Sequence, residues 1–221
     1  MKRNVNLADI SDGRLYNGND MVKADCHGCK GCSLCCRGMG NSVILDPFDV
    51  YRFRCGLGRD LSGMIAEGLV ELHVVDGVVL PNLRMAGEDE SCVFLNGEGR
   101  CGIHGSRPGI CRLFPLGRFY EDGDFKYFLQ TGECPASNRS KVKVSKWIDT
   151  PDGNRNHEFV RNWHYLLNGL EQRLSGMEDA EECKRLNMLM LQTFYIRPYR
   201  TDADFYVQFG NRMEEFTNCE V

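Results

Sequence analysis

Residues 26–36 read CHGCKGCSLCC and place five of the twelve cysteines of the chain within one short stretch. A second group of cysteines follows further along the chain, at Cys92, Cys101, Cys111 and Cys134. Packing of an apolar core does not require so many thiols so close together, whereas zinc sites and iron–sulfur clusters do. The two groups therefore predict a metal–thiolate region around which irregular loops fold.

The spacing within the first group is typical of a metal site, because a Cys-x2-Cys turn presents two thiolates to one ion. This spacing repeats without interruption and ends on two adjacent cysteines, through Cys26, Cys29, Cys32, Cys35 and Cys36. Cys26, Cys29, Cys32 and Cys36 have the spacing x2, x2, x3 of the bacterial ferredoxin motif for a [4Fe–4S] cluster, although Arg37 replaces the usual proline. Two tetrahedral zinc sites are the alternative, since they would use eight of the nine grouped thiols. The cysteine spacing therefore does not decide whether the metal is zinc or iron.

The composition is that of an ordinary globular protein. Of its 221 residues, 42% are hydrophobic and 26% are charged, and the net charge is −4. Nucleic-acid and anionic-membrane binders usually carry an excess of basic residues. We therefore expect neither nucleic acid nor membrane as a partner, whereas a protein partner or substrate and the oligomeric state stay open.

The first 25 residues contain no apolar stretch of the kind found in secretory signals, and the chain has no run of 18 apolar residues. These features predict a cytoplasmic protein. Structural disulfides are rare in the reducing cytosol. The grouped cysteines are thus predicted to be metal ligands and not a disulfide scaffold.

Local signals predict an α+β fold, in which an irregular, metal-stapled cysteine-rich region with short helices and β-hairpins precedes a small helical region. Asp46–Pro47 and Asp60 are typical of helix starts, and Asp76–Gly77 and residues 121–124 are typical of hairpin turns. Three apolar stripes at helical spacing follow: Phe159, Trp163, Leu166, Leu167, Leu170 and Leu174; Cys183, Leu186, Met190 and Phe194; and Phe205, Phe209, Met213 and Phe216. The predicted organisation is an N-terminal arm (1–25), a cysteine-cluster domain (26–135), a linker (136–155) and a helical C-terminal region (156–221).

Two stretches carry a resemblance to a known family. The run Cys-x2-Cys-x2-Cys-Cys over residues 29–36 is followed by CVFL over residues 92–95, then by Cys101 and by RPGICRLFP over residues 107–115. Together they resemble the zinc- or iron-chelating CxxCxxCC family, also known as cysteine-cluster proteins. The resemblance covers about half of the chain and implies eight metal ligands: Cys29, Cys32, Cys35, Cys36, Cys92, Cys101, Cys111 and Cys134. Cys26 is additional to the family pattern and completes the set of candidate ligands.

The metal-binding interpretation has alternatives. Flagellin lysine N-methylases resemble this family through the same cysteines, which implies a protein lysine N-methyltransferase that binds S-adenosylmethionine at or near a metal or iron–sulfur centre. The sequence contains no G-x-G-x-x-G fingerprint after a strand that would support it. Thiol–disulfide exchange and metal delivery or sensing are further alternatives, although the sequence lacks the βαβ pattern of thioredoxins. No catalytic residue is predicted.

The basic residues near the cysteines have two interpretations. Four thiolates on one Zn²⁺ leave a net negative charge, which Arg107, Arg112, Arg37 and Lys30 could offset by donating to sulfur. Arg107 and Arg112 could instead bridge loops by donating to backbone carbonyls, because the arginine fork serves both purposes.

Several residues are ambiguous. Cys101-x2-His104 has a ligand spacing, but a single histidine is more often structural. Side chains of adjacent residues diverge in extended backbone, so one of Cys35 and Cys36 is predicted to serve a second metal site or to stay a reactive thiol. Cys55 and Cys183 are predicted to be small apolar core residues, and Cys219, near the end of the sequence, is predicted to be either such a residue or exposed.

Overall fold

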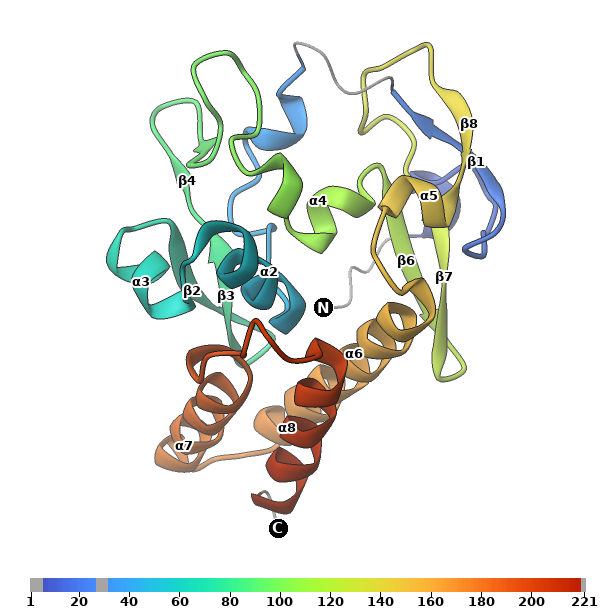
Figure 1. Cartoon of the computed structure of the whole chain (residues 1–221). Helices are drawn as coiled ribbons and strands as arrows, with labels where there is room; N and C mark the ends of the chain where they lie inside the picture. Colours follow the sequence, from blue (N-terminus) through green and yellow to red (C-terminus); the bar gives the residue numbers. More distant parts are fainter. Residues whose placement is uncertain (1–5, 27–31, 220–221) are drawn as a thin grey trace.

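The computed structural model describes residues 6–26 and 32–219. It confirms the predicted α+β class: within these ranges the strands form four separate two-stranded sheets, and the longest helices lie toward the C-terminus. Figure 1 shows these long helices on one side of the molecule and the cysteine-rich region on the other, with the short helix α4 (Gly109–Leu113) lying between two groups of strands.

Helices α2 (Pro47–Leu57) and α3 (Leu61–Ala66) begin where the sequence predicts. Asp46 Oδ1 accepts a hydrogen bond from the backbone N–H of Asp49 at 2.9 Å, and Asp49 Oδ2 accepts one from the N–H of Asp46 at 3.0 Å. Asp60 caps α3 through its own side chain. Such caps satisfy backbone donors that a helix start would otherwise leave unpaired.

Both predicted hairpins are present, as β2 (Val70–Val75) with β3 (Val78–Leu83), and β6 (Leu116–Glu121) with β7 (Asp124–Leu129). Each turn is a pair of residues in the left-handed region, with φ of +51° at Asp76 and +84° at Gly77, and +50° at Asp122 and +77° at Gly123. Two consecutive positive φ values define the turn that matches the twist of paired strands, which explains the Asp-Gly sequence at both places.

The cysteine-rich region is built from very short elements. They are the 3-10 turns η1 (Leu34–Cys36) and η2 (His104–Ser106), the strands β4 (Met85–Ala86) and β5 (Ser91–Cys92), which pair with each other, and the helix α4. None of these elements is long enough to be stable by itself in water. Their arrangement therefore depends on tertiary contacts.

The N-terminal segment and residues 136–155 are more regular than an arm and a linker. After the short helix α1 (Leu7–Ile10), β1 (Met21–Asp25) pairs with β8 (Ser140–Lys143), and α5 (Val144–Ile148) packs beside them. Together with residues of α4, β6 and β7, these elements form a small core of Val22, Ala24, Leu113, Leu116, Leu129, Val144 and Ile148. Pairing between strands so far apart in the sequence leaves no local signal, which is why the polar sequence suggested irregular segments.

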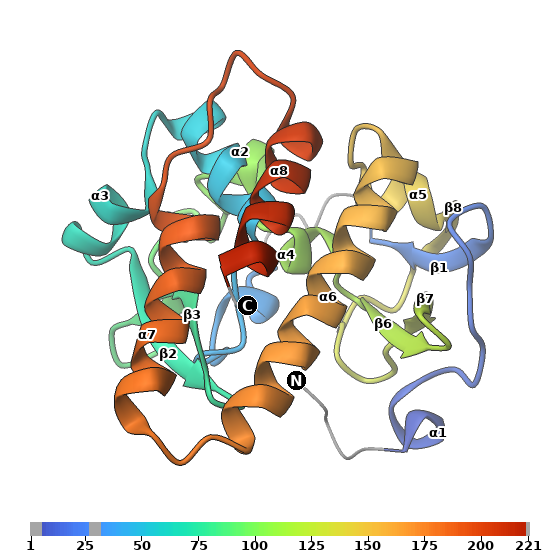
Figure 2. The ribbon, with the colours of Figure 1, turned by 90° about the horizontal axis from the view of Figure 1, so that it is seen from below.

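The main core joins the C-terminal helices to the first half of the chain. The helices are α6 (Gly153–Ser175), α7 (Ala180–Leu191), which continues as the π-helical turn η3 (Gln192–Ile196), and α8 (Phe205–Cys219). The three predicted apolar stripes form their buried or partly buried faces. Residues of α2, α3, β2 and β3 belong to the same core, so the helices share one core with residues on the other side of the predicted boundary. Figure 2 shows α7 beside β3 and α8 beside α2.

Polar contacts fix the helices against this core. The hydroxyl of Tyr195 donates to the carbonyl of Leu45 at 2.8 Å, and the Asn187 side chain accepts from the N–H of Val79 at 2.7 Å. The buried guanidinium of Arg212 donates hydrogen bonds to three carbonyl oxygens near the end of η3 and so provides partners for these acceptors. Within the described ranges, no helix is both long and apolar enough to cross a membrane.

Candidate metal centre

Within the described residues, the turn η1 carries two cysteines of the first group, Cys35 and Cys36. Arg37 follows it and forms an antiparallel bridge with Ser91, the first residue of β5. Its guanidinium donates to the Ser91 hydroxyl at 2.6 Å and to the carboxylate of Asp89 at 2.9 Å. These contacts dock the turn on the β4–β5 hairpin and so bring the first cysteine group to the second.

A tight loop brings Cys101 back toward Cys92. Leu95 and Cys101 form an isolated antiparallel bridge across the loop. Inside the loop the Asn96 side chain accepts from the N–H of Arg100 at 2.8 Å, and the Asn96 N–H donates to the Arg100 carbonyl at 2.9 Å. Asparagine favours such local turns because its side chain bonds to the backbone a few residues on.

The third segment is α4, which carries Cys111 and is held at both ends by other helices. At its beginning, Asp49 Oδ1 accepts from the N–H of Gly109 at 2.7 Å. At its end, the indole N–H of Trp147 on α5 donates to the carbonyl of Phe114 at 3.2 Å. The segment therefore takes its place from α2 and α5, and not from its own five residues.

These segments surround one cavity of about 100 Å³. Five cysteines from four segments line it: Cys35 and Cys36 of η1, Cys92 of β5, Cys101 of the loop, and Cys111 of α4. The rest of the wall is mostly apolar, from Met39, Val43, Leu83, Met85, Phe94, Ile103, Ile110 and Phe114, and Arg107 is its charged residue. A cavity lined by thiols and apolar groups disfavours hydration and favours a soft cation.

Electrostatics couple the cavity thiols to one another. The hydrogen bond from the Cys35 thiol to Cys36 and burial both raise the pKa of Cys35, whereas the same hydrogen bond lowers the pKa of Cys36. Burial raises the pKa of Cys92 and of Cys111, and the negative charge of Asp49 adds to the shift at Cys111. Because burial and the neighbouring thiols disfavour the charged form, Cys35, Cys92 and Cys111 hold their protons at neutral pH unless a cation replaces them.

The donor set fits zinc or iron, since both metals are bound by groups of thiolates. Within residues 6–26 and 32–219, however, no three cysteine, histidine or acidic side chains are arranged to hold one ion together. The thiols thus line one cavity, but their sulfur atoms do not all point toward one ion position. Cys29, a predicted ligand, lies outside the described residues.

The other candidate ligands lie away from the cavity wall. Cys26 follows β1, Cys32 is exposed, and Cys134 lies in the loop after β7; all three are outside the set of residues that line the cavity. His104 is exposed on η2 and is also outside it. Among the cysteines apart from both groups, Cys183 packs against the main core as predicted, and Cys219 is exposed, which was one of its two predicted states. The prediction of a buried Cys55 is wrong, because this residue is exposed on α2.

The structure separates the two predicted arginine roles. Arg107 lines the cavity, and its positive charge acts to lower the pKa of Cys35. Arg112, on the same helix as Cys111, is buried but its Nε donates to the carbonyl of Ile148 on α5 at 2.9 Å. The interpretation of Arg112 as a bridge to a backbone carbonyl is therefore confirmed, because a helical residue next to Cys111 points to a different side of α4.

Sequence reasoning missed the supporting residues of the site. The apolar wall comes from positions whose burial depends on segments far apart in the sequence. Asp49 was missed as well, although its signal was present: Asp46-x2-Asp49 ahead of an apolar stripe is the spacing of a capping box. That spacing predicts one role for Asp49, and the contact with Gly109 is a second one that only the fold supplies.

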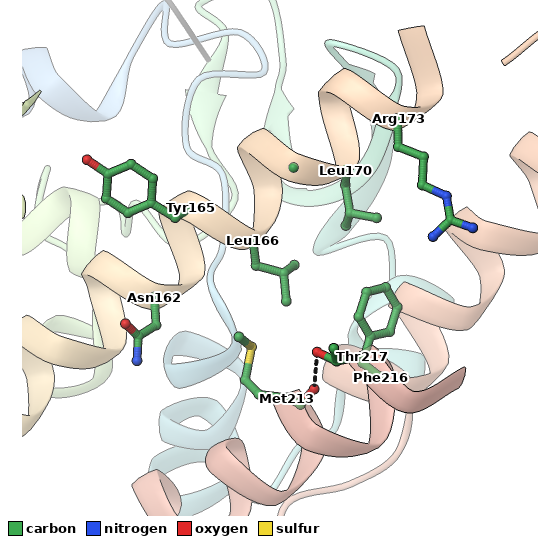
Figure 3. Close-up of a pocket in the computed structure, with 9 residues that line it drawn as sticks. Asn162, Tyr165, Leu166, Leu170, Arg173, Met213, Phe216 and Thr217 are labelled. Carbon is green, nitrogen blue, oxygen red and sulfur yellow. Dashed lines mark hydrogen bonds between the residues drawn. The ribbon is translucent and has the colours of Figure 1, made fainter. Parts of the chain in front are cut away.

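A larger groove of about 360 Å³ lies between α6 and α8 (Figure 3). Leu166 and Leu170 of α6 and Phe216 of α8 form its apolar floor, with Arg173 at one end. The described residues that line it include no thiol, imidazole or carboxylate. Despite its size, the groove therefore has no donor set for zinc or iron.

Comparison with known proteins finds a metal-chelating family over the residues that carry the cavity cysteines. Residues 28–135 match the model of the CxxCxxCC family, described as "Putative zinc- or iron-chelating domain". No curated protein and no solved structure matches the chain. The likeness to flagellin lysine N-methylases, and with it S-adenosylmethionine as a cofactor, stays a prediction. Residues 28–135, which include the cysteine-rich region, belong to the CxxCxxCC family.

Proposed function

We propose that the thiols around this cavity bind zinc or iron, and that the bound metal joins the η1 turn, the β4–β5 hairpin and α4. The observation that carries the proposal is that five cysteines from four separate segments line one small cavity. Apolar packing needs no such collection of thiols, whereas thiolate donors suit zinc, iron and iron–sulfur centres.

The residues of this chain supply the donors and their surroundings. Cys35, Cys36, Cys92, Cys101 and Cys111 would hold the metal, and it would act there as a cross-link between elements that are too short to be stable alone. Arg107 offsets part of the negative charge of the thiolates. The apolar wall limits access of water to the sulfur atoms.

The nature of the metal is tested on the whole chain purified without oxygen. A broad absorption near ~400 nm together with iron and sulfide in the protein would support an iron–sulfur cluster. A colourless protein that contains zinc would support thiolate sites with a structural role.

The ligands are tested by serine substitution. We expect Cys92→Ser and Cys111→Ser each to lower the bound metal severalfold, because each removes a thiolate from the cavity wall. Cys55→Ser is the matched control, since Cys55 is an exposed thiol on α2. Metal content unchanged in both cavity variants would contradict the proposal.

A further inference from the structure

Helix α4 is the cavity segment that depends most on outside support. It has five residues, from Gly109 to Leu113, and helices of this length do not persist alone in water. Its Cys111 therefore reaches the cavity only because other elements hold α4 in place. Trp147 supports its end, and Asp49 supports its beginning.

Asp49 is unusual because each of its two carboxylate oxygens accepts a hydrogen bond from a backbone N–H group. Oδ2 accepts from the N–H of Asp46 at 3.0 Å and completes the capping box of α2. Oδ1 accepts from the N–H of Gly109, the first residue of α4, at 2.7 Å. The residue is 2% exposed, so water does not compete for either bond. A buried carboxylate is costly without such partners.

From this geometry we infer that Asp49 is a positioning residue of the metal centre, which fixes Cys111 at the cavity by joining the start of α2 to the start of α4. The inference rests on the proposed function. A carboxylate can accept at both places at once, whereas an amide of the same shape has one oxygen and must lose one of the two bonds. The structure thus assigns a role to the pair of carboxyl oxygens of Asp49.

Asp49→Asn tests this assignment, and Asp46→Asn is its matched control. Both substitutions remove one acidic group from the same capping box. The Asp46 side chain accepts from the N–H of Asp49 through Oδ1, and an amide oxygen can keep that bond. The pair therefore separates the loss of an acidic group from the loss of one of the two hydrogen bonds that Asp49 accepts.

Binding of Cd²⁺, a soft divalent ion that thiolates bind, is measured for each variant by competition with a chelator. We expect Asp49→Asn to weaken binding on the order of tenfold, as is typical for residues that orient metal ligands, and Asp46→Asn to change it by less than about twofold. Equal affinity in Asp49→Asn and the wild type would overturn the inference.

A double-mutant cycle with Cys111→Ser shows whether Asp49 acts through Cys111. If it does, Asp49→Asn has no further effect on Cd²⁺ affinity once Cys111 is replaced. If it weakens binding equally in both backgrounds, it acts through the general fold and the inference is wrong. A wild type that binds no Cd²⁺, or a Cys111→Ser variant that binds it as well as the wild type, would instead refute the proposed function.

A measurement on the wild type keeps the test decisive if Asp49→Asn fails to fold. Coupling between two sites is reciprocal, so Cd²⁺ binding should slow hydrogen exchange of the Gly109 amide that bonds to Asp49. Exchange of this amide that is unchanged by Cd²⁺, while the ion is bound, would overturn the inference.

Discussion

Gly117 of β6 lies opposite Phe128 of β7, and its hydrogen side chain leaves room for the phenyl ring. A Cβ atom at Gly117 would come within 2.3 Å of that ring. We expect Gly117→Ala to lower the free energy of unfolding by roughly 1–3 kcal/mol, because a buried ring must move. Gly169→Ala is the control: nothing lies within 4 Å of its added Cβ in the middle of α6, so alanine should stabilise the helix by about 0.5–1 kcal/mol. Urea unfolding measures both, and a destabilised Gly169→Ala with an unaffected Gly117→Ala would contradict this account.

The cavity thiols make metal binding depend on pH. The pKa values of Cys35, Cys92 and Cys111 are raised above the ordinary thiol value of 9.0, so metal must displace their protons. Zinc affinity should therefore rise with pH, by about tenfold per pH unit for each proton released. Chelator competition at several pH values checks this. A flat profile across neutral and mildly alkaline pH would show that these thiols are not the ligands.

The raised pKa values of these thiols also determine how the stability of the metal-free chain changes with pH. A thiol whose pKa is raised by folding stabilises the folded state below the unfolded value of 9.0, and this contribution is lost as pH rises through the folded pKa. The metal-free protein should therefore lose stability above pH 9.0, whereas the metal-loaded protein should lose its metal as pH falls. Thermal melts of both forms across this range distinguish them.

At the scale of elements, the pairing of α4 with α5 depends on Arg112. Its buried guanidinium donates to the carbonyl of Ile148 on α5, which packs against α4. Arg112→Met should lower the free energy of unfolding by roughly 1–3 kcal/mol, because a carbonyl loses its partner, and should leave the metal content unchanged. Arg185→Met removes an exposed ion pair with Glu182 and is expected to have no measurable effect. Loss of metal without loss of stability in Arg112→Met would restore the thiol-donor role.

At the scale of the whole molecule, most of the main core lies outside the cysteine cavity, and Val43, Leu83 and Ile103 belong to both. The main core is formed by the C-terminal helices with α2, α3, β2 and β3, which carry large apolar side chains. Removal of metal under reducing conditions should therefore release η1, the β4–β5 hairpin and α4, and leave most of the helical circular-dichroism signal intact. Hydrogen exchange with and without a chelator measures where protection is lost. Complete unfolding on chelation, or unchanged protection of α4, would contradict this expectation.

The local features of this protein could be predicted from its sequence. Asp46 and Asp60 start helices, and Asp-Gly pairs form both hairpin turns, because caps and turns are decided by a few neighbouring residues. The apolar stripes of α6, α7 and α8 follow from helical periodicity. The spacing of the cysteines likewise indicated a thiolate site and its family.

The tertiary structure decided which of these features meet. The pairing of β1 with β8, the selection of five cysteines for one cavity, the turn of Arg112 toward α5 and the second bond of Asp49 all join segments distant in the sequence. No local pattern encodes such contacts, because each depends on how the main core orients elements that are too short to be stable alone. The sequence by itself determined the ligand chemistry, and only packing around the core determined which thiols share a cavity and which residues hold them there.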